Sequence, residues 1–389
     1  PSQPTTRSHA AYATISGCHR AEHRFDALRA SASKRCSIRD SPIEQHMRAR
    51  IRSSAATGLS RQPTAASAHL YSETRLVFTP GNMPKSIKVL IGGGSGFIGK
   101  YLTRKLQSQG AKVKIITRST VPRSDQVTWS SIRSDGLPPG TDCVVNLAGN
   151  KLMDPLKRWN EEFKNLAYIS RVETTRLLAN SIDKLQPAEK PKSFLVATGV
   201  GYYKPSDTFE YNENSGPGTS SSGDFISQLA VDWEKASKLN DADGDNVRQV
   251  IIRPGAVIGR DGGVLQGLYL PYLFYVGGPV GSGKQWFPWI HVQDLANMFV
   301  FSIFNNHVAG IINGVAPQII TNAEFSQALG RAMNRPSMIP MPEIVVKLLF
   351  GNDRAVMMLQ GQKVKSRAEL LGFRYDFPYI DIALADCVK

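Results

Sequence analysis

The sequence predicts an α/β fold, a doubly wound parallel sheet with a small, mostly helical C-terminal lobe. Between Ile87 and Arg253, short β-rich runs alternate with helical patterns. This alternation implies right-handed crossovers and a parallel sheet that is covered on both faces. Glycine and proline crowd residues 254–288, which predicts loops over a cleft more than further sheet. Near the C-terminus, "TNAE" at Thr321–Glu324 has capping-box spacing and predicts a helix that ends before Pro336.

The predicted strands are short runs rich in apolar and β-branched residues. In chain order they are "IKVLIGG", "AKVKIITRS", "TDCVVNLAG", "KSFLVATGV" and "VRQVIIRPG". Between them, apolar residues at helical spacing predict a helix over about 97–109, which Gly110 stops, and a long helix over about 160–183. A further helix begins in "SGDFISQLAVDWEK", with Asp224 as its N-cap.

Residues 1–83 have a composition that does not build a core. They are rich in Arg, Ser, Ala and Thr, and their twelve basic and five acidic residues carry close to half of the formal net charge of +15. Such a composition is typical of an organelle transit peptide, and the alternative is a basic arm that binds acidic partners. A natural start at Met83 would remove the segment from any function. We therefore expect a mitochondrial protein on the matrix side, with a plastid as the alternative.

Cysteine usage argues against a protein stabilised by disulfides or a metal ion, and hydropathy argues against a membrane-spanning protein. Four scattered cysteines never stand at metal-ligand spacing, so we expect neither a metal site nor a disulfide framework, and a reducing compartment fits. The longest apolar stretch, "GGVLQGLYLPYLFYVGGPVG", is interrupted by Pro271 and bounded by glycines. It is too short and too broken for a transmembrane segment.

Directly after the first predicted strand, "GGGSGFIGK" contains a G-x-x-G-x-x-G pattern. The first glycine allows a tight turn, the second lets the backbone approach a pyrophosphate, and the third lets the following helix pack closely on the strand. The N-terminus of that helix presents free N–H groups to the phosphates. A strand before the loop and an amphipathic helix after it strengthen the prediction of a dinucleotide site. Its predicted residues are Gly93, Ser95, Gly96, Phe97, Ile98 and Gly99.

The end of the second predicted strand, "IITRS", indicates which dinucleotide is bound. A carboxylate at this place would bind the 2′-hydroxyl of the adenosine ribose, whereas Arg118 offers a cation for a 2′-phosphate. We therefore expect NADP(H) in preference to NAD(H), with hydroxyl contacts from Thr117 and Ser119. The alternative is that Arg118 is a solvated residue at a strand end.

Several motifs resemble the extended short-chain dehydrogenase/reductase family. They are "GGSGFIG", "NLAG" (Asn146–Gly149), "RPGAVIGR" (Arg253–Arg260) and "WIHVQDLA" (Trp289–Ala296). More narrowly, "KRWN", "SRVETT", "GYY", "GGPVGSGKQWFPWIH" and "GFRYDFP" resemble the epimerase-like family 39U. The resemblance covers residues 88 to about 385 and leaves only the basic segment outside.

The resemblance implies a Rossmann domain at residues 86–254 that binds NADP(H). Residues 255–389 then form the substrate side and the C-terminal lobe, with part of the chain returning to the Rossmann domain. Further cofactor contacts are implied for Leu147, Ala148, Gly149, Arg171, Thr198 and Val257. For Arg171, an ion pair with Glu173 or with a neighbouring helix is the alternative.

One feature of the resembling family is missing from the sequence. Its active members combine a strand-end Ser or Thr with a Tyr and, four residues later, a Lys that assists proton exchange. Thr198 can supply the hydroxyl, but Asp224 or Phe225 stands at the tyrosine position and Gln228 at the lysine position. Tyr202 and Tyr203 are the remaining catalytic candidates, although packing or rim positions are the alternative for both.

Two other groups of residues allow a functional and a structural interpretation. His291 with Asp294 resembles a base and the residue that orients it, or else a tie between the lobe and the sheet. Trp286, Phe287 and Trp289 either line a pocket for an apolar or planar substrate or form a hydrophobic plug under the lobe.

The sequence leaves two main hypotheses about function. The first is an NADP(H)-dependent oxidoreductase or epimerase without the Tyr-x-x-x-Lys dyad, acting on an unknown small molecule. The second is a catalytically silent, NADPH-binding accessory or structural subunit of a mitochondrial, respiratory complex, with the N-terminal arm as a contact. Nucleic-acid binding is a weaker third hypothesis that depends on Lys151, Lys157, Arg158 and Lys164, and no DNA partner is expected. Whether the chain is an enzyme stays open at this point.

Overall fold

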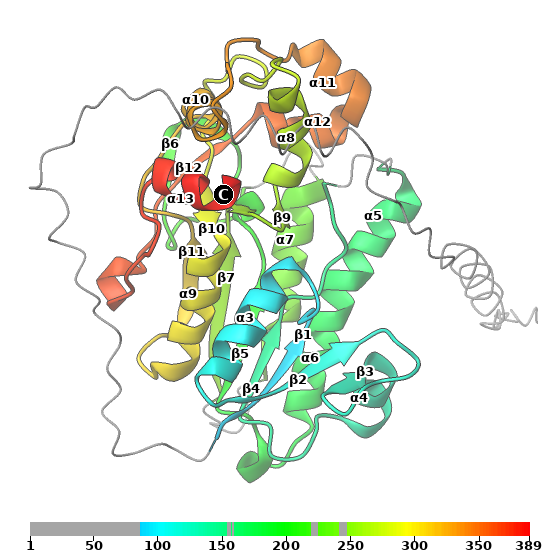
Figure 1. Ribbon diagram of the computed structural model, residues 1–389. Coiled ribbons are helices and arrows are strands. Elements are labelled where there is room, and N and C mark those ends of the chain that lie inside the picture. Colours follow the sequence, from blue (N-terminus) through cyan, green and yellow to red (C-terminus); the bar gives the residue numbers. More distant parts are fainter. Residues whose placement is uncertain (1–85, 154–156, 158, 219–224, 241–246) are drawn as a thin grey trace, which may run out of the picture. The chain divides into compact units, whose positions relative to one another are not determined.

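The computed structural model describes residues 86–153, 157, 159–218, 225–240 and 247–389, and Figure 1 shows their helices and strands. The basic segment 1–83, Arg158 and the predicted N-cap Asp224 lie outside the described residues. Within the described ranges, no helix has both the length and the hydropathy to cross a membrane.

Seven parallel strands form the central sheet, in the order β11-β7-β5-β4-β1-β2-β3. The chain order reverses between β1 and β4, and ligands of such sheets bind outside the carboxyl ends of the strands at this reversal. The predicted doubly wound fold is confirmed. The strands are β1 (Lys88–Gly92), β2 (Lys112–Thr117), β3 (Gln126–Thr128), β4 (Cys143–Asn146), β5 (Ser193–Ala197), β7 (Arg248–Pro254) and β11 (Gly310–Gly314).

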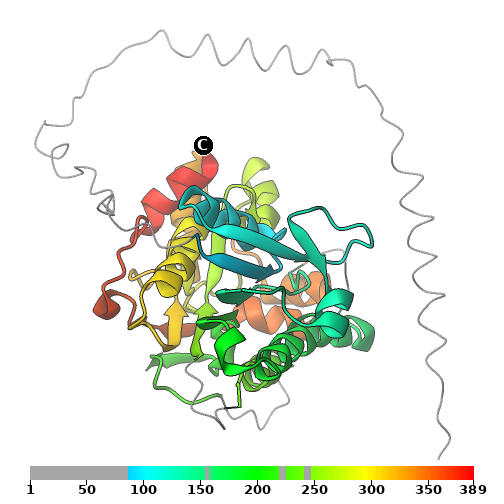
Figure 2. The same cartoon turned by 90° about the horizontal axis from the view of Figure 1, so that it is seen from below.

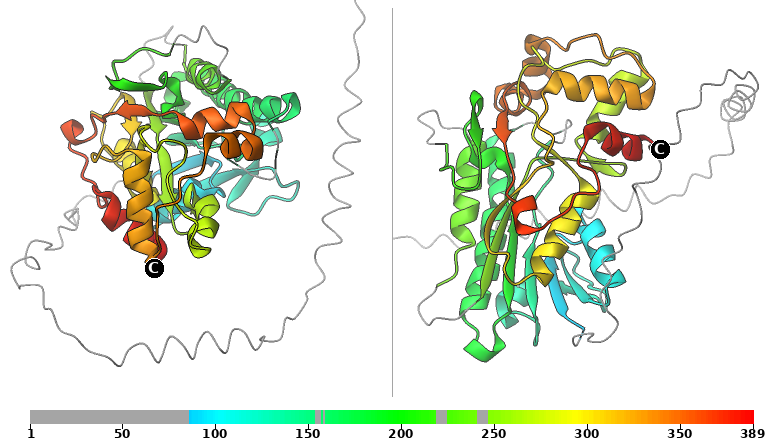
Figure 3. Two further views of the ribbon diagram at one scale, coloured as in Figure 1. Left: turned by 90° about the horizontal axis from the view of Figure 1, so that it is seen from above. Right: turned by 90° about the vertical axis from the view of Figure 1, so that its left-hand side faces the viewer.

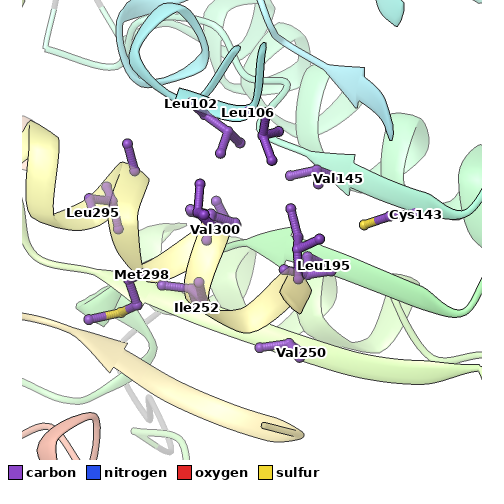
Figure 4. Close-up of a cluster of buried hydrophobic side chains, with 14 of the residues drawn as sticks. Leu102, Leu106, Cys143, Val145, Leu195, Val250, Ile252, Leu295, Met298 and Val300 are labelled. Atoms are coloured by element: carbon purple, nitrogen blue, oxygen red, sulfur yellow. The ribbon is translucent and has the colours of Figure 1, made fainter. Parts of the chain in front are cut away.

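Side chains of the buried strands alternate between two hydrophobic clusters, one on each face of the sheet. On β4, Cys143 and Val145 belong to one cluster and Val144 to the other, as the two-residue period of a strand requires. The first cluster lies beneath α3 (Phe97–Ser108) and α9 (Val292–Phe304). Figure 4 shows its centre, where side chains of the two helices approach those of the strands.

The second face of the sheet is covered by α4 (Trp129–Asp135), α6 (Thr174–Asp183) and α7 (Phe225–Ala236). Figures 2 and 3 show the strands between these helices and the α3 and α9 layer. The predicted long helix over 160–183 is present in three parts, α5 (Glu161–Tyr168), the π-helical turn η1 (Ile169–Glu173) and α6. Short 3-10 turns are η2 (Pro187–Glu189), η3 (Val200–Tyr202) and η4 (Glu369–Leu371).

The remaining elements form the C-terminal lobe and its connections. One small sheet contains β8 (Ala256–Gly259), β9 (Gly262–Gly263) and β10 (Trp289–His291). A second contains β6 (Ser206–Tyr211) and β12 (Gln362–Val364). The helices are α8 (Leu265–Leu273), α10 (Asn322–Met333), α11 (Glu343–Phe350), α12 (Asn352–Leu359) and α13 (Ile380–Val388). The predicted capping box is confirmed, since Thr321 and Glu324 bond each other's backbone N–H groups at the start of α10.

The prediction of loops more than sheet over 254–288 was partly wrong. The stretch contains β8, β9 and α8. A run of β-branched residues, Val257 and Ile258, pairs with β10 despite the glycines and prolines around it. Pro271 lies inside α8, near its C-terminal end, where only one helical hydrogen bond is lost.

Candidate functional site

The glycine loop between β1 and α3 lies against the turn that follows β4. Gly93 has a positive φ of 78°, and a β-carbon there would stand 2.6 Å from the carbonyl carbon of Leu147. A β-carbon at Gly99 would stand 2.3 Å from the carbonyl oxygen of Gly93, so the first turn of α3 packs directly on the loop. Both positions therefore require glycine for close approach.

Gly96 differs from the other two glycines because it has free space beside it. A β-carbon there would stand 3.1 Å from the carbonyl oxygen of Gly93, and apart from the two chain neighbours no other heavy atom of the described residues would lie within 4 Å. Gly96 is also the N-cap of α3, without a side-chain cap or an acidic residue in the first turn. The N–H groups at this helix start are therefore available to an anion that approaches along the open side of Gly96.

Asn146, at the end of β4, fixes the "NLAG" turn. Its side chain is fully buried; Oδ1 accepts the N–H of Ala148 at 3.0 Å, and Nδ2 donates to Oγ1 of Thr175 at 2.7 Å. The same Thr175 oxygen accepts the indole N–H of Trp233 at 2.8 Å. The turn that faces Gly93 is thus bonded to α6 and α7.

Arg171 is buried beside the same turn, in the π-helical segment η1. Its Nη2 donates to the carbonyl oxygen of Asn150 at 2.8 Å, and a β-carbon on Gly149 would lie 2.9 Å from the guanidinium carbon. Burial lowers the pKa of Arg171 to about 10. The alternative of an ion pair with Glu173 is wrong, because Glu173 pairs with Arg176. Among the described residues, no carboxylate pairs with Arg171.

The predicted adenosine end of the site lies at the end of β2. The glycine loop contacts this strand, since a β-carbon on Gly94 would stand 2.9 Å from Cγ1 of Ile115. Thr117 Oγ1 accepts the N–H of Ser119 at 3.1 Å, which shapes the chain after the strand. Arg118 between them is exposed, and no carboxylate of the described residues pairs with it.

The three catalytic candidates converge on a buried ion pair. Arg253, at the end of β7, donates from Nε and Nη2 to the two carboxylate oxygens of Glu234 on α7, each at 2.7 Å. Thr198, which follows β5, donates its hydroxyl to the same carboxylate at 3.1 Å. Arg253 Nη1 donates to the hydroxyl of Tyr203 at 2.7 Å, and the ring of Tyr202 lies 3.5 Å from the guanidinium carbon.

A cavity of about 650 Å³ opens one residue further along the chain, and the side chains of the ion-pair cluster are not part of its wall. Its wall includes Lys204 and Pro205, which directly follow Tyr203, and Phe225 and Ser227 from the first turn of α7. Other parts of the wall come from Trp159, which stacks edge-on against Phe225, and from residues of α12. The cavity is large enough for a small organic molecule.

The predicted lysine position, Gln228, does not face this cluster. Its side chain is exposed and donates to Asp232, one turn further along α7, at 3.0 Å. The face of α7 that meets the end of β5 carries Glu234, which contacts Thr198, and Ile226, which lies against Gly201. Ala230 lies between them on that face, because positions four residues apart share one side of a helix.

Val257 and Phe97 occupy the junction of the sheet and the lobe. Val257, in β8, is half-buried and pairs with Ile290 of β10. The ring of Phe97 packs under the glycines of β8 and β9, where a β-carbon on Gly262 would lie 2.7 Å from it. The start of α3 is therefore packed against the segment that carries Val257.

Comparison with known proteins decides the family. A model of the NAD dependent epimerase/dehydratase family matches residues 89–313, and one of a domain of unknown function, DUF1731, matches residues 341–387. The chain belongs to the NAD dependent epimerase/dehydratase family.

Individual relatives show which branch of this family the chain resembles. The epimerase family protein SDR39U1 of Mus musculus is 46% identical over 304 residues, which are 78% of this chain and 100% of the mouse protein. A chloroplastic homologue from Arabidopsis thaliana is 33% identical over 79% of this chain and 89% of its own length. The crystal structure of human SDR39U1 with NADPH is 45% identical, has a TM-score of 0.73 and covers 78% of this chain and 99% of its own. The expected resemblance to family 39U is confirmed.

In this family member, His291 and Asp294 bond to other residues than each other, and Nε2 of His291 lies 3.5 Å from the carboxylate of Asp386. His291 caps α9 by accepting the N–H of Gln293 at 3.4 Å, and its ring stacks on Phe377 at 3.9 Å between centroids. Asp294 accepts the N–H groups of Asp376 and Phe377 at 2.8 and 2.9 Å. Both side chains tie the C-terminal segment to α9, which favours the structural alternative.

The aromatic residues near 286–289 also have structural contacts. Trp289 is buried in the core of the lobe, and Phe287 packs on Phe325 with ring centroids 4.3 Å apart. Trp286 donates its indole N–H to the carbonyl oxygen of Asp207 at 2.8 Å. These contacts fit the hydrophobic plug, and none of the three rings lines the 650 Å³ cavity.

Sequence reasoning missed three residues that organise the site, Asn146, Glu234 and Arg253. Asn146 and Arg253 stand inside quoted motifs at strand ends, where buried polar residues signal a function for the side chain. Glu234 gave no such signal, because an acidic residue in a helix is ordinary until its buried partner is known.

Proposed function

We propose that this protein binds NADP(H) between the glycine loop and the "NLAG" turn and transfers hydride to or from a small carbonyl or alcohol substrate. The observation that carries the proposal is the open side of Gly96 at the uncapped start of α3. It offers unbonded N–H groups to a pyrophosphate. NADPH in the crystal structure of the human relative supports the same cofactor here.

The proposed orientation of the cofactor follows the sheet. The adenosine end lies at Thr117, Arg118 and Ser119, and the exposed guanidinium of Arg118, which pairs with no carboxylate of the described residues, favours the 2′-phosphate of NADP(H). The middle runs past Leu147, Ala148, Gly149 and Arg171, and the nicotinamide end lies near Thr198 and Val257. The substrate occupies the cavity of about 650 Å³ whose wall includes Lys204, two residues after Tyr202, and Phe225.

We also infer that proton exchange does not use the Tyr-x-x-x-Lys dyad. The face of α7 towards Thr198 carries Ile226 and Ala230, which cannot exchange protons, and Gln228 is exposed. The protein is therefore an oxidoreductase or epimerase whose acid or base lies elsewhere in the cleft.

The second candidate is a catalytically silent, NADPH-binding subunit of a mitochondrial complex. A specific observation favours it, because the hydroxyls of Thr198 and Tyr203 are bonded to neighbouring side chains and are not directed to a ligand. An organelle location is part of both proposals. The composition of residues 1–83 favours a mitochondrion, and the chloroplastic relative supports the plastid alternative.

One experiment separates the two candidates. Purified protein is loaded with NADPH and offered a library of ketones and nucleotide sugars, and oxidation is followed by loss of absorbance at the nicotinamide band. Turnover supports the enzyme. Absence of turnover, together with migration in a large complex on native gels of organelle extracts, supports the silent subunit. Mass spectrometry of the endogenous N-terminus then shows whether residues 1–83 remain on the mature protein.

A further inference from the structure

The ion pair of Arg253 and Glu234 holds the guanidinium group in one orientation. Arg253 is 1% exposed, and its two parallel bonds to Glu234 are both 2.7 Å long. A bidentate pair of this kind fixes the plane of the guanidinium as well as its position. The third donor, Nη1, is bonded to Tyr203, so the group cannot rotate without losing a bond.

Tyr202 lies on the face of this fixed guanidinium. The distance from the guanidinium carbon to the ring centroid is 3.5 Å, which is a close cation–π contact. The ring belongs to the 3-10 turn η3, in which the N–H of Tyr202 bonds to the carbonyl oxygen of Gly199 at 3.1 Å. Both the backbone and the ring of Tyr202 are therefore held in place.

Of the three candidate hydroxyls, only that of Tyr202 keeps its proton free for a ligand. Thr198 donates to Glu234, so its proton is not available to a substrate oxygen. Tyr203 is 0% exposed, and its hydroxyl contacts Asn313 and the carbonyl oxygen of Asn212 in addition to Arg253. Tyr202 is half-buried, and its hydroxyl bonds to Arg253, which has only donors, so within the described residues no carboxylate, amide or main-chain carbonyl takes its proton.

We propose that Tyr202 is the residue that exchanges the proton with the substrate oxygen, and that Arg253 and Glu234 are positioning residues for it. This inference depends on the proposed function. When bound, NADPH supplies the hydride that reduces the carbonyl carbon and becomes NADP⁺. Tyr202 gives the proton of its hydroxyl to the carbonyl oxygen, the product is the alcohol, and the resulting phenolate takes a proton from water.

The charges around Tyr202 determine whether its hydroxyl is better suited to act as an acid in reduction or as a base in oxidation. Burial raises the pKa of Tyr202 above its usual value, Arg253 from β7 opposes this, and Glu234 from α7 adds to it. The phenol is consequently protonated over the physiological range and acts as an acid. Reduction therefore stays constant as pH rises until the phenol ionises, whereas oxidation of the alcohol accelerates with pH because it needs the phenolate.

The first arm of the test compares Tyr202→Phe with wild-type protein. The substitution keeps the ring on Arg253 and removes the hydroxyl together with its bond to Arg253. We expect the dissociation constant for NADPH to change less than about twofold and kcat for carbonyl reduction to fall about 100-fold or more. The probe is a ketone panel that includes 9,10-phenanthrenequinone. Tyr379→Phe, at a tyrosine 60% exposed on the lobe, is the matched control and should keep wild-type kcat.

The outcomes of this arm separate the two proposals. Turnover by wild-type protein that survives in Tyr202→Phe to within threefold would overturn the role of Tyr202 and leave the proposed function intact. No oxidation of bound NADPH by wild-type protein with any probe would overturn the proposed function and the role of Tyr202 together.

The second arm follows the ionisation of Tyr202 without any turnover. Protein labelled with ¹³C at Cζ of tyrosine is titrated by NMR, and the signal of Tyr202 is identified by its absence from Tyr202→Phe. Glu234→Gln removes an anion and should lower the pKa of Tyr202, whereas Arg253→Met removes a cation and should raise it. Shifts of the same sign, or no shift in Glu234→Gln, would refute the positioning role. If Arg253→Met does not fold, Glu234→Gln alone decides.

Discussion

Replacement of Asn146 by alanine tests whether the "NLAG" turn is prearranged for the cofactor. The amide of Asn146 makes two short bonds that alanine cannot make, one to the N–H of Ala148 and one to the hydroxyl of Thr175, and a longer one of 3.4 Å to the hydroxyl of Thr174. Ala148 and Thr175 are both buried, so the loss of either short bond is not compensated fully by water. Asn146→Ala should therefore destabilise the fold and loosen the turn that faces Gly93.

The size of the effect follows from the two partners. The N–H of Ala148 loses its acceptor, and an unsatisfied buried donor costs about 1–3 kcal/mol. The hydroxyl of Thr175 keeps its bond to Trp233, so its loss is that of one ordinary hydrogen bond, about 1 kcal/mol. We expect a free energy of unfolding lower by about 2–4 kcal/mol. If NADPH binding has to order the loosened turn at a cost of about 1.4 kcal/mol, the dissociation constant for NADPH rises about tenfold.

Urea denaturation and a fluorescence titration with NADPH measure the two effects. Asn297→Ala is the matched control, because the amide of Asn297 makes an exposed bond to Asp376 and should contribute less than about 0.5 kcal/mol. A stability within 0.5 kcal/mol of wild type, combined with unchanged NADPH affinity in Asn146→Ala, would refute the structural role assigned to this amide.

Three further predictions concern the loop, the cofactor preference and pH. Gly99→Ala places a β-carbon 2.3 Å from the carbonyl oxygen of Gly93 and should lower the free energy of unfolding, measured in urea, by about 1–3 kcal/mol. Gly267→Ala is the control, because Gly267 has open space around it in α8, and this variant should be neutral or stabilising. Arg118→Ala should reduce the preference for NADPH over NADH about 10- to 100-fold in competitive titrations, and Arg123→Ala, which breaks only an exposed pair with Asp125, should not. Burial lowers the pKa of His291 to about 4, so protonation of this side chain in the unfolded state lowers the free energy of unfolding as pH falls from 6.5 towards 4. His291→Gln should flatten that part of a pH–stability profile. An unchanged profile would contradict the lowered pKa of His291.

The parallel sheet could be predicted because its signals are local. Each strand is a short apolar run that alternates between two clusters, as Val144 and Val145 do, and each crossover helix has its own apolar stripe. The glycine loop was predictable for the same reason, since the turn, the strand and the helix are contiguous in sequence. The lobe was harder, because β8 is a short β-branched run inside a segment where glycine and proline predominate.

The side-chain network of the site could not be predicted from local patterns. Thr175 and Trp233 lie 29 and 87 positions after Asn146 in the chain, and Glu234 meets Arg253 only because α7 packs beside β7. The lysine position of the family was predicted at Gln228 by matching "SQLAVDWE" to the family's helix, and this match does not reveal which face of the helix meets the end of β5. The contact of Glu234 with Thr198 identifies that face and moves the relevant positions to Ile226 and Ala230.

Substitution of Gly96 by valine tests whether the open side of the α3 N-terminus receives NADP(H). The φ of Gly96 is −74°, which valine can adopt, and the β-carbon would stand 3.1 Å from the carbonyl oxygen of Gly93, so this carbonyl shifts by a few tenths of an ångström while the fold persists. The side chain would instead occupy the approach of the pyrophosphate. We predict a melting temperature close to that of wild type with NADPH affinity reduced at least about 100-fold, equivalent to about 2.8 kcal/mol. Wild-type affinity for NADPH in Gly96→Val would contradict the account.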